Sequence, residues 1–141
     1  MKTIIVTDPC YILDDKTWDE LGNKYGWDDE FVDKLGEKLR EISGDDKAVV
    51  GTTGFGDWEN EIAGHSFYAD SGLVCVVKET EALKDYLKEL LPLGGAARLE
   101  VPEDAFYELN FMNPHWTKVI IWEDGFKKKI AESLDEEELC D

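Results

Sequence analysis

The feature that most constrains the fold is an apolar run at residues 73–77, directly after the turn signal Asp70-Ser71-Gly72. A continuous apolar run of this length is typical of a central β-strand that is buried on both faces. It is the longest fully apolar stretch in the chain, far below the roughly 20 residues that a membrane-spanning helix needs. The sequence therefore predicts a protein built around an internal strand, with no membrane segment.

Further strands are predicted on both sides of this run, at segments rich in β-branched, aromatic or alternating apolar residues. They cover residues 3–6, 48–53, 58–62, 67–69, 96–101, 106–111, 117–122 and 126–130. Turn residues at Gly54-Phe55-Gly56-Asp57 and at Glu123-Asp124-Gly125 separate neighbouring strands.

Three helices are predicted between the strands. The clearest follows Asp28 and Asp29, which offer N-caps; its apolar residues recur at helical spacing from Phe31 to Ile42, and Gly44 ends it. The other two are expected over residues 16–21, closed by Gly22, and over residues 79–91.

The order of these elements indicates the fold class. Strands that come in runs, without strict alternation with helices, favour an α+β fold with a mainly antiparallel sheet. We expect two to three helices packed on that sheet in a single domain, residues 1–131. An acidic C-terminal tail, residues 132–141, follows it.

The charge of the chain narrows the possible partners. Thirty-three acidic residues against 15 basic ones give a formal charge of −18. Binding to a phosphate backbone needs Lys and Arg to replace counterions, so this excess argues against direct nucleic-acid binding and against adsorption to an anionic membrane. Two explanations stay open: the charge confers solubility only, or it imitates the phosphates of a nucleic acid.

The cysteines and the N-terminus predict a reduced cytoplasmic protein. Cys10, Cys75 and Cys140 are odd in number and widely spaced, which does not fit a disulfide framework. His65 and His115 have no cysteine at ligand spacing, so no zinc site is expected. The apolar N-terminal segment is too short for a signal peptide. We expect no cofactor.

The sequence contains no convincing catalytic motif. Cys10, in Asp8-Pro9-Cys10-Tyr11, lies among carboxylates that would raise the pKa of a thiol and reduce its reactivity. The glycine loop at residues 54–57 lacks the cation and the helix of a phosphate site. The remaining alternative is a small-ligand or metal-binding protein, or an enzyme, that uses Cys10 with the strand-end aspartates Asp8, Asp57 and Asp70.

The aromatic residues suggest a binding surface. The chain has five tryptophans, which a core of this size does not bury completely: Trp18, Trp27, Trp58, Trp116 and Trp122. Trp58 stands beside Glu59 and Glu61, and Trp122 precedes the acidic pair 123–124. Aromatic anchors inside an acidic rim suit a basic protein partner. A sheet core with amphipathic edges is the alternative explanation.

Three motifs resemble a family of small phage and prophage proteins of uncharacterised function. Those proteins carry an Asp-Pro-Cys-Tyr segment, a Gly-Tyr/Phe-Gly-Asp-Gly hairpin and an Asp-Ser/Ala-Gly strand start, as residues 8–11, 54–57 and 70–72 do here. The chain departs from the pattern at Trp58, where the family has glycine. The resemblance covers roughly residues 4–77 and implies a phage or mobile-element origin, without an activity or site residues.

Origin and charge together predict a non-enzymatic inhibitor that is similar in class to anti-CRISPR proteins. Its expected partner is a basic nucleic-acid-binding protein of the bacterial host, such as the CRISPR nuclease Cas9, whose DNA interaction it would block. A phage structural or immunity-type protein, with charge for solubility only, is a further alternative. The expected partner-binding residues are Asp28, Asp29, Glu30, Asp33, Glu37, Glu41, Trp58, Glu59, Glu61, Trp122, Glu136, Glu137 and Glu138.

Overall fold

The computed structural model describes residues 1–52, 58–62, 65–69, 71–87, 95–113, 116–123 and 128–132. For residues 58–62, 65–69, 111–113, 116–118 and 128–132 it describes the backbone alone. Its elements are β1 (Lys2–Thr7), the 3-10 helix η1 (Pro9–Tyr11), α1 (Asp15–Tyr25), α2 (Asp29–Ser43), β2 (Val49–Thr52), β3 (Trp58–Ile62), β4 (His65–Ala69), β5 (Leu73–Lys78), the 3-10 helix η2 (Glu81–Leu83), α3 (Lys84–Leu87), β6 (Ala96–Val101), β7 (Phe106–Asn113), β8 (Trp116–Trp122) and β9 (Lys128–Glu132).

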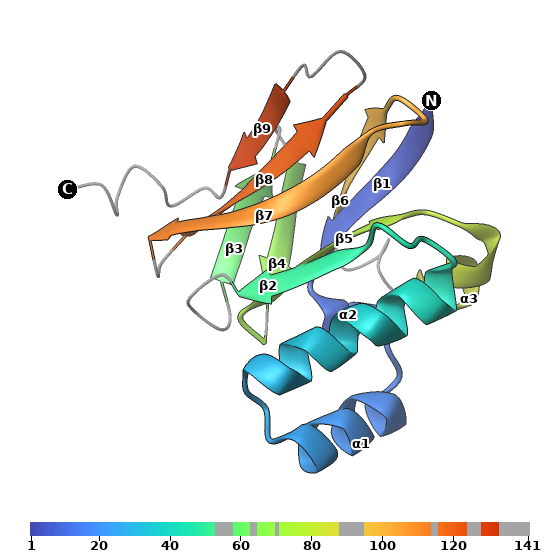
Figure 1. Cartoon of the computed structure of the whole chain (residues 1–141), viewed down its shortest axis with the longest axis vertical. Helices are drawn as coiled ribbons and strands as arrows, with labels where there is room; N and C mark the ends of the chain where they lie inside the picture. Colours follow the sequence, from blue (N-terminus) through green and yellow to red (C-terminus); the bar gives the residue numbers. More distant parts are fainter. Residues whose placement is uncertain are drawn as a thin grey trace.

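The strands form three sets, and every described ladder is antiparallel. A four-stranded central sheet has the order β2-β5-β1-β6, a hairpin joins β3 to β4, and a three-stranded sheet has the order β7-β8-β9. Figure 1 shows α1 and α2 on one side of the central sheet and β7, β8 and β9 on the other. The predicted α+β fold with a mainly antiparallel sheet is confirmed.

The central position of β5 follows from its sequence. Its residues alternate between two cores, as a strand with a side-chain period of two requires. Val74 and Val76 pack with Val119 of β8 in the core between the sheets. Cys75 packs with Leu35 of α2 in the core between sheet and helices. The apolar run is therefore buried on both faces, as its composition predicts.

The first helix ends later than expected. Gly22 does not close it: α1 continues to Tyr25, and Gly26 is the C-cap, with a left-handed φ of 86°. The carbonyl of Gly22 accepts the hydrogen bond from the N–H of Gly26, at 2.8 Å, inside a regular last turn. The prediction was wrong because Gly22 is required by a tertiary contact: the side chain of Trp27 packs so closely on it that a larger residue would clash.

Several further boundaries differ from the expectation or lie beyond the described part. The third predicted helix begins with η2 and continues as α3, and residues 88–94 are outside the described residues. β9 includes Glu132, the first residue of the expected tail. The structure also does not describe the glycine-rich turn at 54–57, the turn residues 124–125 and residues 133–141.

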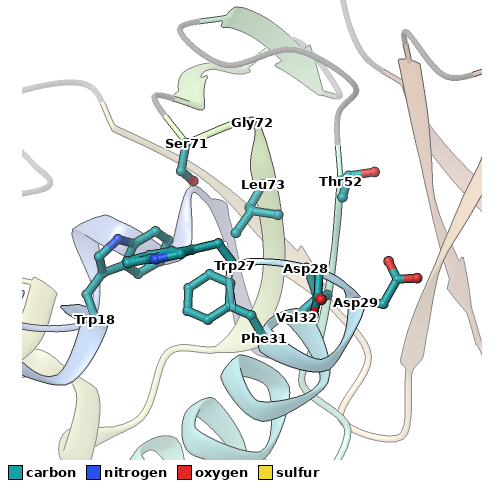
Figure 2. Close-up of a pocket in the computed structure, with 10 residues that line it drawn as sticks. All are labelled: Trp18, Trp27, Asp28, Asp29, Phe31, Val32, Thr52, Ser71, Gly72 and Leu73. Atoms are coloured by element: carbon teal, nitrogen blue, oxygen red, sulfur yellow. The ribbon is translucent and has the colours of Figure 1, made fainter. Parts of the chain in front are cut away.

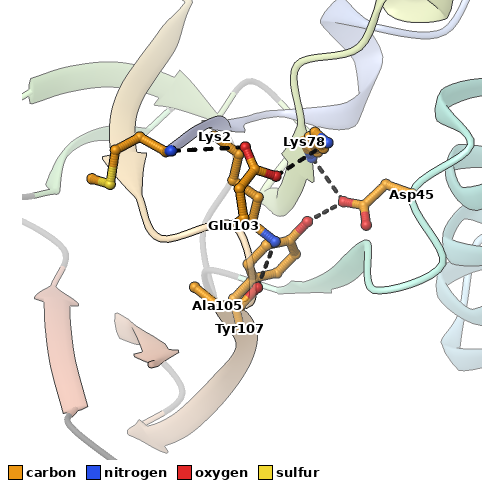
Figure 3. A network of polar contacts seen from close by, with 7 residues as sticks. Lys2, Asp45, Lys78, Glu103, Ala105 and Tyr107 are labelled. Atoms are coloured by element: carbon orange, nitrogen blue, oxygen red, sulfur yellow. Dashed lines mark hydrogen bonds and ion pairs between the residues drawn. The ribbon is translucent and has the colours of Figure 1, made fainter. Parts of the chain in front are cut away.

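A buried polar network ties the central sheet to β7 (Figure 3). Asp45, which follows α2, accepts hydrogen bonds from the backbone N–H of Lys78, at 2.8 Å, and from the hydroxyl of Tyr107. The ammonium of Lys2 donates to the carbonyl of Ala105 and lies 5.5 Å from the centroid of the Tyr107 ring. Buried polar groups that are paired in this way fix the relative position of the elements that carry them.

Candidate partner-binding site

An open pocket lies where α1 is joined to α2, and its volume is about 660 Å³. Figure 2 shows the indoles of Trp18 and Trp27 on one side of it and the carboxylates of Asp28 and Asp29 on the other. The described residues that line the pocket are Trp18, Trp27, Asp28, Asp29, Phe31, Val32, Thr52, Ser71, Gly72 and Leu73.

The connection between the helices places Trp27 at the surface. Its φ of 60° is the only positive φ of a non-glycine residue in the described part of the chain. A left-handed backbone costs an L-residue about 1–2 kcal/mol. Strain of this kind concentrates at functional sites. Asp28 then starts α2 as its N-cap, where the carboxylate accepts from the N–H of Glu30 at 3.1 Å.

Three aromatic rings form one cluster in the wall of the pocket. The ring centroids of Trp27 and Phe31 are 4.8 Å apart, and those of Trp18 and Phe31 are 5.2 Å apart with the rings nearly perpendicular. These distances are in the range of favourable aromatic pairs. Phe31 is buried, while 49% of Trp27 is exposed to solvent. The buried ring supports an indole that remains available to a partner.

Gly22 makes room for the indole of Trp27 on the surface of α1. A Cβ atom built on Gly22 would lie 2.0 Å from Cζ2 of Trp27, far inside van der Waals contact. The helix therefore needs glycine at this position, although glycine lowers helix propensity. The result is an indole that is held in one place between the helix and its neighbouring rings.

Negative charge at this site is concentrated at the N-terminal end of α2. Asp28, Asp29, Glu30 and Asp33 are all exposed, and none of them forms an ion pair with another described residue. No Lys or Arg is found among the described residues that line the pocket. The pocket is therefore apolar and aromatic inside and anionic at its rim.

Further along α2 the acidic residues have basic neighbours. Glu37 pairs with Lys34 at 3.1 Å, and Glu41 pairs with Lys38 at 3.6 Å. All four side chains are about one third exposed or more, and exposed pairs of this spacing are weak and sensitive to salt. The acidic face expected over residues 28–46 therefore has ion pairs at Glu37 and Glu41, whereas at its first turns the one attraction to a basic neighbour is that of Glu30 to Lys34, which does not reach an ion pair among the described residues.

The other predicted anchors are not brought to this pocket. Trp122 is half-buried and stacks on Phe106, with centroids 6.2 Å apart. Figure 1 shows the end of β8, where Trp122 lies, on the far side of the molecule from the start of α2. Trp58, Glu59 and Glu61 lie on β3, and their side chains are outside the described residues, as are residues 136–138.

The sequence predicts neither Trp18 nor Trp27 as an anchor. The signal is the segment Gly26-Trp27-Asp28, in which a tryptophan stands between a helix-ending glycine and a helix-starting aspartate. Such a residue lies between the two helices, so its side chain is not part of the packing face of either helix. The contact of this tryptophan with Gly22 could not be predicted, because no local sequence pattern links the two residues.

Asp8, which the alternative hypothesis uses, has a structural role. It is completely buried and accepts from the N–H of Cys10 at 2.9 Å, and from the N–H and hydroxyl of Ser71 at 2.7 and 2.8 Å. Burial raises the pKa of Asp8 above its ordinary value. Its two oxygens thus cap η1 and hold Ser71 at the edge of the pocket.

A metal site finds no support among the described residues, which contain no group of three His, Cys, Asp or Glu side chains that could hold an ion. Asp57 and Asp70, the other two strand-end aspartates, are outside them.

No family model, curated protein or solved structure matches this chain. No helix in the described part has both the length and the apolar character that crossing a bilayer requires.

Proposed function

We propose that this protein is a non-enzymatic binding protein that captures a basic partner protein on the surface around the α1–α2 pocket. The observation that carries this proposal is the half-exposed Trp27 beside carboxylates that no described cation neutralises. Protein interfaces use this combination of an aromatic anchor with a polar rim that excludes water from it.

The charge of the whole chain supports the same function. A formal charge of −18 attracts a basic partner over a distance and speeds the encounter, while aromatic contacts determine which partner stays bound. Attraction between exposed charges is screened by salt, with a Debye length of about 10 Å at 0.1 M. Binding should therefore weaken as the salt concentration rises.

The partner that we propose is a basic nucleic-acid-binding protein of a bacterial host, with the CRISPR nuclease Cas9 as the first to test. The acidic surface would occupy the groove that otherwise holds DNA. Support comes from the net charge and from the resemblance of residues 8–11, 54–57 and 70–72 to phage proteins.

A competition gel shift tests this function. Guide-loaded Cas9 is mixed with labelled target DNA and increasing amounts of this protein, at 50 mM and at 200 mM salt. We expect the Cas9–DNA complex to be lost at the lower salt, and more protein to be needed at the higher salt. An intact complex at both salt concentrations would exclude the DNA-loading step of Cas9 as the target.

A further inference from the structure

We propose that the α1–α2 pocket holds a guanidinium group, so that an arginine side chain of the basic partner is the anchor of the complex. This inference rests on the proposed function, because it names the chemical group that the partner inserts. It goes further in one respect: the pocket would distinguish arginine from lysine, which overall charge does not.

The aromatic wall fits a flat cation. A guanidinium stacks on the face of an indole by cation–π and π contacts, and tryptophan is the best ring for this purpose. Trp27 offers a half-exposed indole, and the ring centroid of Trp18 lies 6.0 Å from that of Trp27, with the planes inclined at 50°. Two inclined indoles therefore border the same pocket.

The rim fits the hydrogen-bonding edge of the same group. Asp28 and Asp29 both line the pocket, on the side away from the two indoles (Figure 2). Carboxylates receive the planar fork of arginine through two parallel N–H···O bonds, whereas an ammonium acts as a point charge. An arginine could stack on Trp27 and donate to a carboxylate at once, which a lysine does less well.

The walls of the pocket are fixed before a partner arrives. Trp27 is confined by Gly22 of α1 and by the buried ring of Phe31. Ser71, which also lines the pocket, is held by the buried carboxylate of Asp8. A site that is ordered in the free protein loses little conformational entropy on binding, which favours affinity for the group that fits it.

Two capped peptides of equal charge, hexaarginine and hexalysine, test the inference. The protein is labelled with ¹⁵N, and the indole N–H signals of its five tryptophans are followed during each titration at 50 mM salt. We expect hexaarginine to shift the signals of Trp18 and Trp27 and to bind ~5-fold tighter than hexalysine, the order of magnitude of a cation–π contact.

Two variants test whether the pocket causes the preference. Trp27→Asn removes the ring, and asparagine tolerates the left-handed backbone of this position. Asp28→Asn with Asp29→Asn removes two charges, and asparagine remains a good N-cap. We expect Trp27→Asn to abolish the preference for hexaarginine and the double variant to weaken hexaarginine binding several-fold. Phe106→Asn is the matched control, because it removes a ring of similar exposure elsewhere, 43% against 49%; it should keep the preference.

The outcomes separate this inference from the proposed function. Binding of both peptides with equal affinity, shifts confined to other indoles, or an unchanged preference in Trp27→Asn would each refute the arginine pocket. Capture of a basic partner would survive all three results. Binding of neither peptide at 50 mM salt would overturn both proposals.

Discussion

Gly22→Ala is expected to destabilise the protein, although the same change in an ordinary helix stabilises it. The new Cβ would lie 2.0–2.2 Å from three atoms of the Trp27 indole, so the ring must leave its place. About half of the ring is covered, roughly 100 Å², and returning it to water costs about 2.5 kcal/mol. Alanine regains about 1 kcal/mol of helix propensity. The free energy of unfolding should therefore fall by about 1–2 kcal/mol.

The measurement is urea unfolding followed by far-ultraviolet circular dichroism. Gly36→Ala in α2 is the matched control, because its Cβ would meet only the guanidinium of Arg40, at 3.1 Å, and a shift of a few tenths of an ångström relieves that contact. That variant should be stabilised by about 0.5 kcal/mol. In a Trp27→Asn background Gly22→Ala should also stabilise, because the obstructing ring is absent. Stabilisation by Gly22→Ala in the native background would refute the packing of Trp27 on α1.

Two further changes test the buried polar groups. Tyr107→Phe removes the hydroxyl that donates to the buried Asp45 and should lower the free energy of unfolding by about 1–2 kcal/mol, whereas the exposed Tyr86→Phe should leave it unchanged. Burial raises the pKa of Asp8 above its ordinary value of 3.8. The folded protein therefore holds this proton more tightly than the unfolded chain. As a result, the contribution of Asp8 to the free energy of unfolding falls as the pH rises through the folded-state pKa. The free energy of unfolding of Asp8→Asn, relative to the native protein, should increase over the same interval; a difference independent of pH would contradict this.

Much of the fold follows from local patterns in the sequence. The apolar run that becomes β5 and the helical spacing of α2 both reflect burial on defined faces, which a single segment records. The N-cap Asp28 was equally visible, because capping is a local interaction. The layered arrangement depends on which faces meet, and that is decided by the whole chain.

The site was less predictable for the same reason. The acidic residues at the start of α2 were recognised from the sequence, and the structure shows them exposed. Trp27 was not recognised as an anchor, because its position depends on Gly22 and on Phe31, which reach it only after α1 and α2 pack. The end of α1 was misplaced because a glycine that admits a ring has the same local appearance as a glycine that ends a helix.

Paired charge reversals test most directly whether the surface around the pocket is the binding surface. The local variant carries Asp29→Lys, Glu30→Lys and Asp33→Lys; the control carries Asp85→Lys, Asp104→Lys and Glu108→Lys, three exposed acids elsewhere with the same change in net charge. Both are compared with the native protein in the Cas9 gel shift at 50 mM salt, after circular dichroism has confirmed their folds. We predict that the local variant needs about tenfold more protein to displace DNA and the control less than about threefold more. Equal losses in the two variants would mean that net charge alone drives binding, and would contradict a defined site at the α1–α2 turn.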